Sequence, residues 1–180
     1  MALKNTSEKY GGIAIGLHWL MAIMIMTLIV VGLFMTDMDD GAQKWQIYGM
    51  HKATGFVVLL LALFRWYWTL TNAKPRPLEG WSVAETAMAH AFKWLLMLMI
   101  LIMPVSGAIM SVASGSAINV YGLFSIPGFE EKNQVIAGFA HDVHEYGAIF
   151  IAILVIMHIL AGLKHHLIKK DDTLNRMMGR

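Results

Sequence analysis

The amino-acid sequence predicts an all-α membrane protein, a bundle of four transmembrane helices with both termini in the cytoplasm. Three observations favour the membrane as its solvent. Hydrophobic residues make up 57% of the chain and charged residues only 14%, and the mean hydropathy is +0.58. A soluble domain carries about 25% charged residues. The third observation is the presence of four apolar segments, each long enough to cross a hydrocarbon core of about 30 Å, which takes roughly 20 helical residues.

We place these helices near residues 12–34, 48–70, 90–112 and 144–168. The first is a retained helix, because its apolar run is longer than that of a secretory signal and no A-x-A-like cleavage site follows it. The second ends before the turn "AKPRP" at 73–77, since two prolines within three residues cannot continue a helix. The connection between the third and fourth helices, roughly 113–143, is long enough to carry a short surface helix.

The distribution of basic residues predicts the orientation of the bundle. Eleven of the fourteen lysines and arginines lie in the two tails or around the second loop: Lys4, Lys9, Arg65, Lys74, Arg76, Lys93, Lys164, Lys169, Lys170, Arg176 and Arg180. The first and third loops hold only Lys44, Lys52 and Lys132, beside seven acidic residues. By the positive-inside rule both termini face the cytoplasm. The net charge of +2 thus reflects membrane topology, and we expect no nucleic-acid partner.

The composition also limits the chemistry of the chain. The sequence has no cysteine, which excludes disulfides, Fe–S ligation, covalent c-type haem attachment and a thiolate nucleophile. It contains no G-x-S-x-G, no phosphate-binding glycine loop and no HExxH zinc motif. Histidine is therefore the only soft donor left in quantity. We expect residues 1–180 to form one domain, because no repeat or low-complexity tract divides them.

Four of the eight histidines fall at two matched depths of the predicted bundle. His18 lies about one and a half turns into the first helix, level with His158 in the inner half of the fourth. His51 and His144 begin the second and fourth helices at the outer side. On the fourth helix the two histidines are about 21 Å apart and within about 40° of each other around the helix axis. This helix therefore offers one inner and one outer ligand.

This pattern is typical of two bis-histidine haem sites in one membrane bundle, because helix bundles hold haem between side chains on facing helices. A flat macrocycle needs room on the neighbouring turn of the same helix face. The residue four positions after each of these histidines is small: Ala22, Gly55, Ala148 and Gly162. The other histidines are followed at this spacing by larger or charged residues, Trp94 after His90, Glu145 after His141, Lys169 after His165 and Lys170 after His166.

The chain resembles the bacterial cytochrome b561 family of four-helix, di-haem membrane cytochromes over nearly its whole length. The resemblance is carried by "LHWLMA" at 17–22, "HKATGFVVLLLALFRW" at 51–66, "MPVSGAIMS" at 103–111, "HEYGA" at 144–148, "MH" at 157–158 and "HHLIKKDDTLNRMM" at 165–178. It implies two haem b groups, with His18 and His158 as axial ligands of the inner iron and His51 and His144 of the outer one. Lys93 and Trp94 depart from the family pattern, where a tyrosine is often found nearby.

Several residues have alternative interpretations. The four histidines could instead be buried side chains bonded to backbone carbonyls, and His141 could replace His144 as the outer ligand. His165 and His166 are most simply interfacial residues, and His90 is either interfacial or a proton donor to a quinone. Arg65 lies fourteen residues after His51 and could contact an inner haem propionate or serve as a positive-inside anchor.

The resemblance implies transmembrane electron transfer coupled to the quinone pool of a respiratory chain, in a multi-pass protein of the bacterial inner membrane. One specific form is a superoxide:quinone oxidoreductase; the acidic outer loops oppose attraction of an anion, although Lys52 beside His51 is a local exception. A second hypothesis is the haem b membrane subunit of a larger dehydrogenase or hydrogenase. A third is a histidine-lined metal or proton transporter, which the lack of intramembrane carboxylates disfavours.

The expected partners are membrane lipid, a quinone, an external electron donor such as superoxide, and a second copy of the chain in a homodimer. Two groups of residues are candidates for the quinone site. The first comprises aromatic residues of the third loop, Tyr121, Phe124 and Phe129. The second is the basic inner group of Lys74, Arg76, His90 and Lys93.

Overall fold

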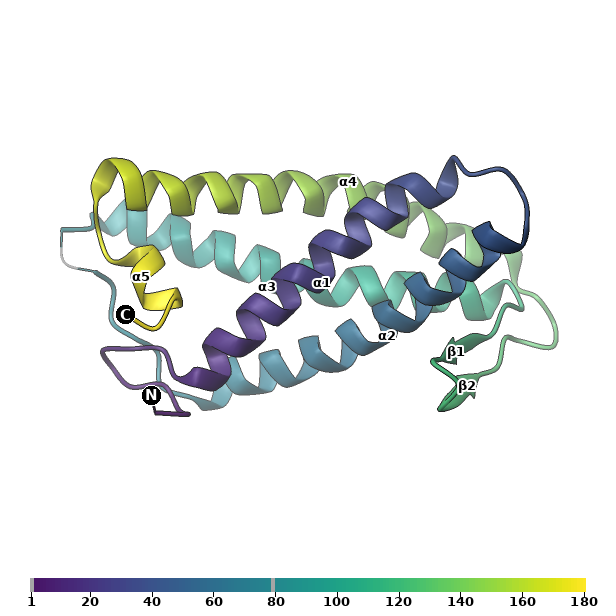
Figure 1. Ribbon diagram of the computed structural model, residues 1–180, viewed down its shortest axis with the longest axis horizontal. Coiled ribbons are helices and arrows are strands. Elements are labelled where there is room, and N and C mark those ends of the chain that lie inside the picture. The colour runs from purple at the N-terminus through teal and green to yellow at the C-terminus, as the bar shows by residue number, and fades with distance from the viewer. Residues whose placement is uncertain (1, 79) are drawn as a thin grey trace.

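A computed structural model describes residues 2–78 and 80–180 of the chain, and four long helices dominate it (Figure 1). They are α1 (Gly12–Thr36), α2 (Ala42–Thr71), α3 (Val83–Ala113) and α4 (Gln134–Lys164). Each is long and apolar enough to cross a membrane. The predicted four-helix membrane bundle is therefore confirmed.

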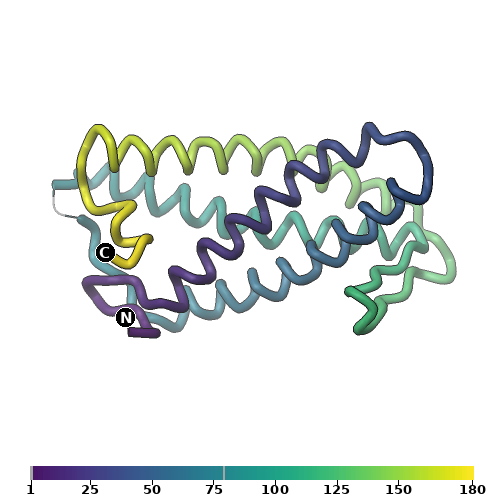
Figure 2. Tube along the Cα trace, in the orientation of Figure 1, coloured from purple at the N-terminus to yellow at the C-terminus, as the bar shows by residue number. Residues whose placement is uncertain are grey.

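The helices do not pack equally closely. Helix α3 lies against both α4 and α2, and α1 crosses obliquely and packs mainly on α2 (Figure 1). Both chain termini lie at one end of the bundle, and the connection between α1 and α2 lies at the other (Figure 2). Following the predicted orientation, we call the end that holds the termini the inner end and the opposite one the outer end.

Helix α3 begins at Val83, seven residues before its predicted start at residue 90. Ser82 caps it: the Ser82 hydroxyl accepts a hydrogen bond of 3.1 Å from the Glu85 amide, and the Glu85 carboxylate accepts one of 3.0 Å from the Ser82 amide. This capping box stabilises a polar first turn. A prediction from hydropathy alone misses such a turn, because its residues are not apolar.

Helix α4 begins at Gln134, ten residues before its predicted start at residue 144. The Asn133 side chain caps it by accepting a hydrogen bond of 3.0 Å from the Ile136 amide. His51 and His144 therefore do not begin their helices, since His51 lies nine residues after Ala42 and His144 ten residues after Gln134. Both helices extend about 14 Å beyond these histidines toward the outer end.

The surface helix predicted in the third loop is wrong, because the chain forms a β-hairpin there. Strand β1 (Ile118–Val120) pairs antiparallel with β2 (Phe124–Ile126), and Ile118 lies opposite Ile126. Tyr121 and Gly122 both have positive φ, 52° and 76°, as the tight turn of a hairpin requires. Asn119 Oδ1 supports the turn by accepting a hydrogen bond of 2.7 Å from the Gly122 amide.

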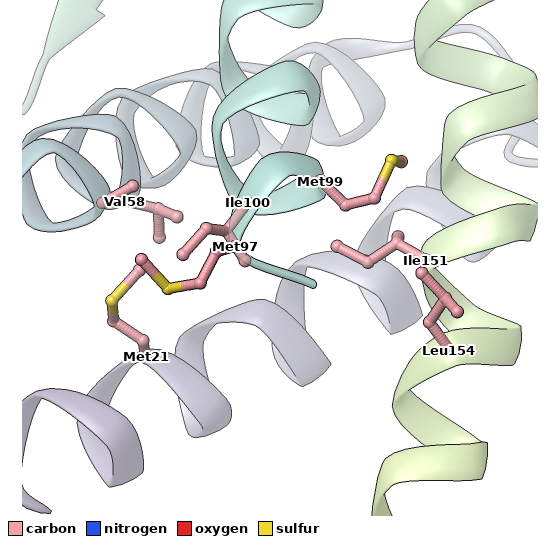
Figure 3. Close-up of a cluster of buried hydrophobic side chains, with 8 residues drawn as sticks. Met21, Val58, Met97, Met99, Ile100, Ile151 and Leu154 are labelled. Atoms are coloured by element: carbon pink, nitrogen blue, oxygen red, sulfur yellow. The ribbon is translucent and has the colours of Figure 1, made fainter. Parts of the chain in front are cut away.

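The hydrophobic core lies midway along the bundle, where side chains from all four helices meet (Figure 3). It consists of Met21, Val58, Ala62, Met97, Met99, Ile100, Ile151 and Leu154. Ile151 and Leu154 lie between His144 and His158 in the sequence of α4. The core therefore separates the level of the inner histidines from that of the outer ones.

At the inner end, α4 continues into a single π-helical turn, His165–Lys169, and the chain then reverses direction. Lys170 adopts the left-handed conformation with φ 54°, which commonly terminates a helix. The short helix α5 (Thr173–Met177) follows and returns toward α1 (Figure 1). The Trp19 indole donates a hydrogen bond of 2.8 Å to the carbonyl of Met177, which ties α5 to α1.

Candidate functional site

The structure brings together the two pairs of histidines that share a depth. The ring centres of His18 on α1 and His158 on α4 are 6.0 Å apart, with their planes at 60°. Those of His51 on α2 and His144 on α4 are 6.3 Å apart, with their planes at 83°. Helix α4 thus contributes one histidine to each pair, and α1 and α2 supply the partners.

The separation of the rings in each pair has the size that one metal ion between two imidazoles requires. A metal–imidazole bond of about 2 Å places a ring centre roughly 3 Å from the metal, so two axial rings are about 6 Å apart. Direct hydrogen bonds or stacking between imidazoles would bring the rings closer. Both pairs therefore fit the bis-histidine coordination of a haem iron.

The surroundings of His144 determine which of its nitrogens is free to bind a metal. His144 Nδ1 lies 2.9 Å from the carbonyl oxygen of Met103 and 3.2 Å from Ser106 Oγ. Because a carbonyl only accepts, Nδ1 carries the proton and donates it to Met103. The lone pair then resides on Nε2, which is the arrangement found in metal-ligating histidines.

Gly107 explains how the His144 ring can lie so close to α3. A Cβ atom at this position would be 2.9 Å from His144 Cε1 and 3.2 Å from Nδ1, closer than side chains normally pack. Gly107 and Ser106 both belong to the "PVSG" element on which part of the sequence resemblance depends. That element therefore forms the surface of α3 against which His144 packs.

Two observations support a further group at the outer pair. His51 Nδ1 is buried and has no hydrogen-bond partner among residues 2–78 and 80–180, a costly state for a polar atom. A Cβ atom at Gly55, one turn after His51, would meet no atom within 4 Å. The same holds for Gly162, one turn after His158. Two of the four small residues predicted to make room for a macrocycle, Gly55 and Gly162, thus lie beside open space, one on each level.

Arg65 lies next to the inner pair. Its Nη2 is 3.4 Å from His18 Nδ1, and its Nη1 is 4.0 Å from the sulfur of Met21. Trp68 lies three residues further along α2, hence on the same side of the helix. Its indole Nε1 is buried without a hydrogen-bond partner in the described parts of the chain. A cation and a free N–H donor at this place suit the propionate groups of a haem.

Two of these neighbours were missed by the sequence reasoning. The sequence does not mark Trp68 as a functional residue, because tryptophans are common at the ends of membrane helices. The Phe92 ring stacks on His158 with ring centres 6.3 Å apart and an angle of 12° between the planes. A phenylalanine in an apolar helix is equally uninformative until the packing of α3 on α4 is known.

The four other histidines lie apart from these pairs. His141 is exposed, and its Nδ1 lies 3.6 Å from Asp142 and 3.5 Å from Glu145. His90 is exposed and borders a shallow surface cavity beside Trp81. His166 is exposed as well. The structure therefore pairs His144, and not the alternative His141, with His51.

His165 proves to be more than a simple interfacial residue. Its ring stacks on that of Trp81, with centres 4.7 Å apart, and its Nδ1 lies 2.6 Å from Asp171 Oδ2. Trp81 and Thr173 also donate hydrogen bonds to the Asp171 carboxylate, and Lys169 forms an ion pair with Glu85. Although burial alone would raise the pKa of Asp171, the hydrogen bonds from Thr173, His165 and Trp81 lower it to about 2.

The hairpin packs on the outer half of α2, next to His51. The Tyr121 and Thr54 hydroxyls are 2.6 Å apart, and the rings of Phe124 and Phe56 are in edge-to-face contact. Lys52 Nζ donates to Ser111 Oγ, Ser116 Oγ and the Ala117 carbonyl, at 3.1 to 3.2 Å. All three acceptors are uncharged, so they do not neutralise the positive charge of Lys52 beside the outer pair.

The remaining quinone candidates lie at both ends of the bundle (Figure 1). Phe129 is exposed. At the inner end, Arg76 pairs through its backbone with Ser7 and Arg176, and the Lys93 ammonium lies 5.7 Å from the Trp94 ring centre. Lys74 is exposed beyond the end of α2.

Comparisons with known proteins point to one family. Residues 9–180 match the profile of a family described as prokaryotic cytochrome b561. Cytochrome b561 homolog 2 of Escherichia coli K12 is 34% identical over 182 residues, spanning 100% of this chain and 96% of the relative. Probable superoxide oxidase CybB of Yersinia pestis is 27% identical over 175 residues, or 95% of this chain and 96% of the relative. Cytochrome b561 homolog 1 of E. coli K12 is 31% identical over 104 residues, or 58% of this chain and 57% of the relative.

Proposed function

The chain belongs to the prokaryotic cytochrome b561 family and is a multi-pass membrane haem protein of the bacterial inner membrane, and from this premise we propose that it carries electrons between two haem b groups and the quinone pool. His18 and His158 would hold the inner haem, and His51 and His144 the outer one. The observation that carries the proposal is the presence of two histidine pairs, each with the ring separation of an axial ligand set, on opposite sides of one hydrophobic core.

The coordination favours electron transfer over oxygen chemistry. A bound haem would supply one-electron redox chemistry, and an iron held by two imidazoles would leave no open position for a substrate. The chain contributes the ligands, a low-dielectric surround and contacts that tune the reduction potential. Among these contacts we include the Met103 carbonyl behind His144, and Arg65 and Trp68 beside the inner pair.

We further propose that superoxide is an electron donor at the outer end. One relative that spans nearly the whole chain is named probable superoxide oxidase CybB. Among residues 2–78 and 80–180, the Lys52 ammonium next to His51 is bonded only to neutral acceptors, and its charge supports local attraction of an anion. Two superoxide anions would each lose one electron and become oxygen, and one quinone would take up both electrons and two protons and become quinol.

A reconstitution of both half-reactions tests this function. The purified protein is exposed to an enzymatic source of superoxide without quinone, and the haem absorption is followed; a ubiquinone analogue is then added. We expect superoxide to reduce the haems, superoxide dismutase to abolish that reduction, and the quinone to reoxidise them. Reduction that persists with the dismutase present would exclude superoxide as the donor. Haems that stay reduced after quinone is added would contradict the coupling to the quinone pool.

A further inference from the structure

A cavity of about 350 Å³ lies at the inner end, where the N-terminal segment meets the C-terminal one. Figure 2 shows the two termini close together at this end. The cavity is lined by Ala2, Lys4, Thr6, Lys9, Tyr10, Arg176, Gly179 and Arg180. Four of these residues are basic and none is acidic. Its volume lies within the range of small-molecule sites, near its lower limit of about 300 Å³.

The walls of the cavity are held in place by hydrogen bonds. On the N-terminal side, the Gly12 amide donates to the Ala2 carbonyl at 2.9 Å, and the Gly11 amide donates to Asn5 Oδ1 at 2.9 Å. A Cβ atom at Gly11 would lie 2.3 Å from the Leu3 carbonyl oxygen, so only glycine permits this close turn. On the C-terminal side, Arg176 donates to the Arg76 carbonyl at 2.7 Å.

The basic side chains that face this cavity lack anionic partners. Lys4, Lys9 and Arg180 make no side-chain hydrogen bond or ion pair with residues 2–78 or 80–180, whereas Lys169 and Lys44 each pair with a carboxylate. Like charges gathered at the edge of a membrane repel one another more strongly than in bulk water. A bound anion would remove this repulsion. The Tyr10 hydroxyl in the same lining could donate a further hydrogen bond to it.

The surroundings indicate where such an anion comes from. Trp19 is 43% exposed, and its indole is bonded to Met177, the residue next to Arg176. Leu20 and Ile23 continue this exposed apolar surface along α1. Tryptophan at such a position marks the headgroup level of a bilayer, and the apolar surface beyond it is suited to acyl chains. Basic pockets at the ends of membrane helices can bind phosphate headgroups.

We propose that the cavity formed by Lys4, Lys9, Arg176 and Arg180 binds the phosphate group of an anionic phospholipid, and that this lipid joins the two terminal segments of the chain. The binding is independent of electron transfer. The phosphate would interact with the lysines and arginines, and the acyl chains would lie against Trp19, Leu20 and Ile23.

The test measures lipid binding to the delipidated, haem-loaded protein in detergent. Phosphatidylglycerol and phosphatidylcholine with the same acyl chains are titrated separately, and bound lipid is counted by native mass spectrometry. We expect one phosphatidylglycerol to bind at least about tenfold more tightly than phosphatidylcholine. The double variant Lys4→Gln/Lys9→Gln, and separately Arg180→Gln, should lose most of this preference. The control Lys164→Gln/Lys170→Gln removes two charges from the same end outside the cavity and should retain it.

Each other outcome overturns the proposal. Equal binding of both lipids would mean that the cavity does not recognise the anionic headgroup. An equal loss of the preference in the control and the cavity variants would mean that the basic residues attract anionic lipid only through the overall charge of this end. Displacement of the lipid by millimolar inorganic phosphate would assign the cavity to free phosphate. Loss of haem from Lys4→Gln/Lys9→Gln, measured by the haem-to-protein ratio, would assign these lysines to the haem site.

Discussion

The His144 imidazole and the Met103 carbonyl are joined by a hydrogen bond of 2.9 Å, which fixes one member of the outer pair against α3. The bond places the proton on Nδ1 and leaves Nε2 available to a metal. The close approach of α3 and α4 at Gly107 makes the bond possible. The geometry of the outer site thus depends on a residue that bears no side chain.

Gly107→Ala should therefore weaken the outer haem site. The new methyl group would lie within 2.9 Å of the His144 ring and push it away from Met103. Loss of such a supporting contact typically reduces metal affinity about 10–100-fold. The measurement is a haem titration of the apoprotein, and Gly138→Ala is the control, because nothing lies within 4 Å of a Cβ there. Equal haem affinity in both variants would refute this role of Gly107.

Arg65→Gln should lower the reduction potential of the inner haem. A nearby cation favours the reduced iron, which carries one positive charge fewer, and Arg65 lies 3.4 Å from His18. We expect a decrease of roughly 60 mV, equivalent to a tenfold change in the equilibrium constant for one electron. A redox titration followed by absorption measures it. An equal shift in Lys164→Gln, at the same end of the bundle, would show that only the overall charge matters.

Lys52→Gln should slow the reduction of the haems by superoxide several-fold and weaken the dependence of this rate on ionic strength, because a local cation steers an approaching anion. The measurement is the initial rate of haem reduction at increasing salt. Lys44→Gln removes a charge that Asp40 already pairs with, and its rate should stay close to that of the wild type. An unchanged rate in Lys52→Gln would separate Lys52 from the reaction, provided that the haem content is unchanged.

The inner end should lose stability in acid through Asp171. The pKa of Asp171 in the folded protein is about 2, below its usual value of 3.8. The contribution of Asp171 to the free energy of unfolding is therefore fully present above about pH 4 and disappears as the pH falls toward 2. Asp171→Asn should therefore have a lower thermal unfolding midpoint than the wild type at pH 7, and the difference should vanish near pH 2. Asp172→Asn, which alters a carboxylate bonded to Asn175, serves as the control. Equal midpoints of wild type and Asp171→Asn at pH 7 would contradict this role.

Most of the bundle could be predicted from the sequence because hydropathy and helix length are sufficient to locate membrane helices. The errors arose where polar caps and turns decide the structure. Ser82 and Glu85 start α3 early, Asn133 starts α4 early, and the Tyr121–Gly122 turn produces a hairpin in place of a helix. All of these lie outside the apolar segments, where hydropathy carries little information.

The pairing of the histidines could also be predicted, since a regular helix fixes both the depth and the direction of a side chain. The contacts around the pairs could not. Phe92 beside His158 and the hydrogen bond from His144 to Met103 depend on how α3 and α4 are rotated against each other. The partners of His165 depend on the reversal of the chain at Lys170. Ligation of haem by the four histidines remains a prediction.

The proposed function requires that each of the two histidine pairs holds one haem. The most direct test is the haem-to-protein ratio and the oxidised and reduced absorption spectra of the wild type and of His18→Ala, His158→Ala, His51→Ala and His144→Ala, with His141→Ala as the control. We expect two low-spin b haems in the wild type and in His141→Ala. The His18 and His158 variants should lose one haem, and the His51 and His144 variants the other. A protein without haem, or losses that do not follow these pairs, would contradict ligation by these histidines and favour a histidine-lined transporter.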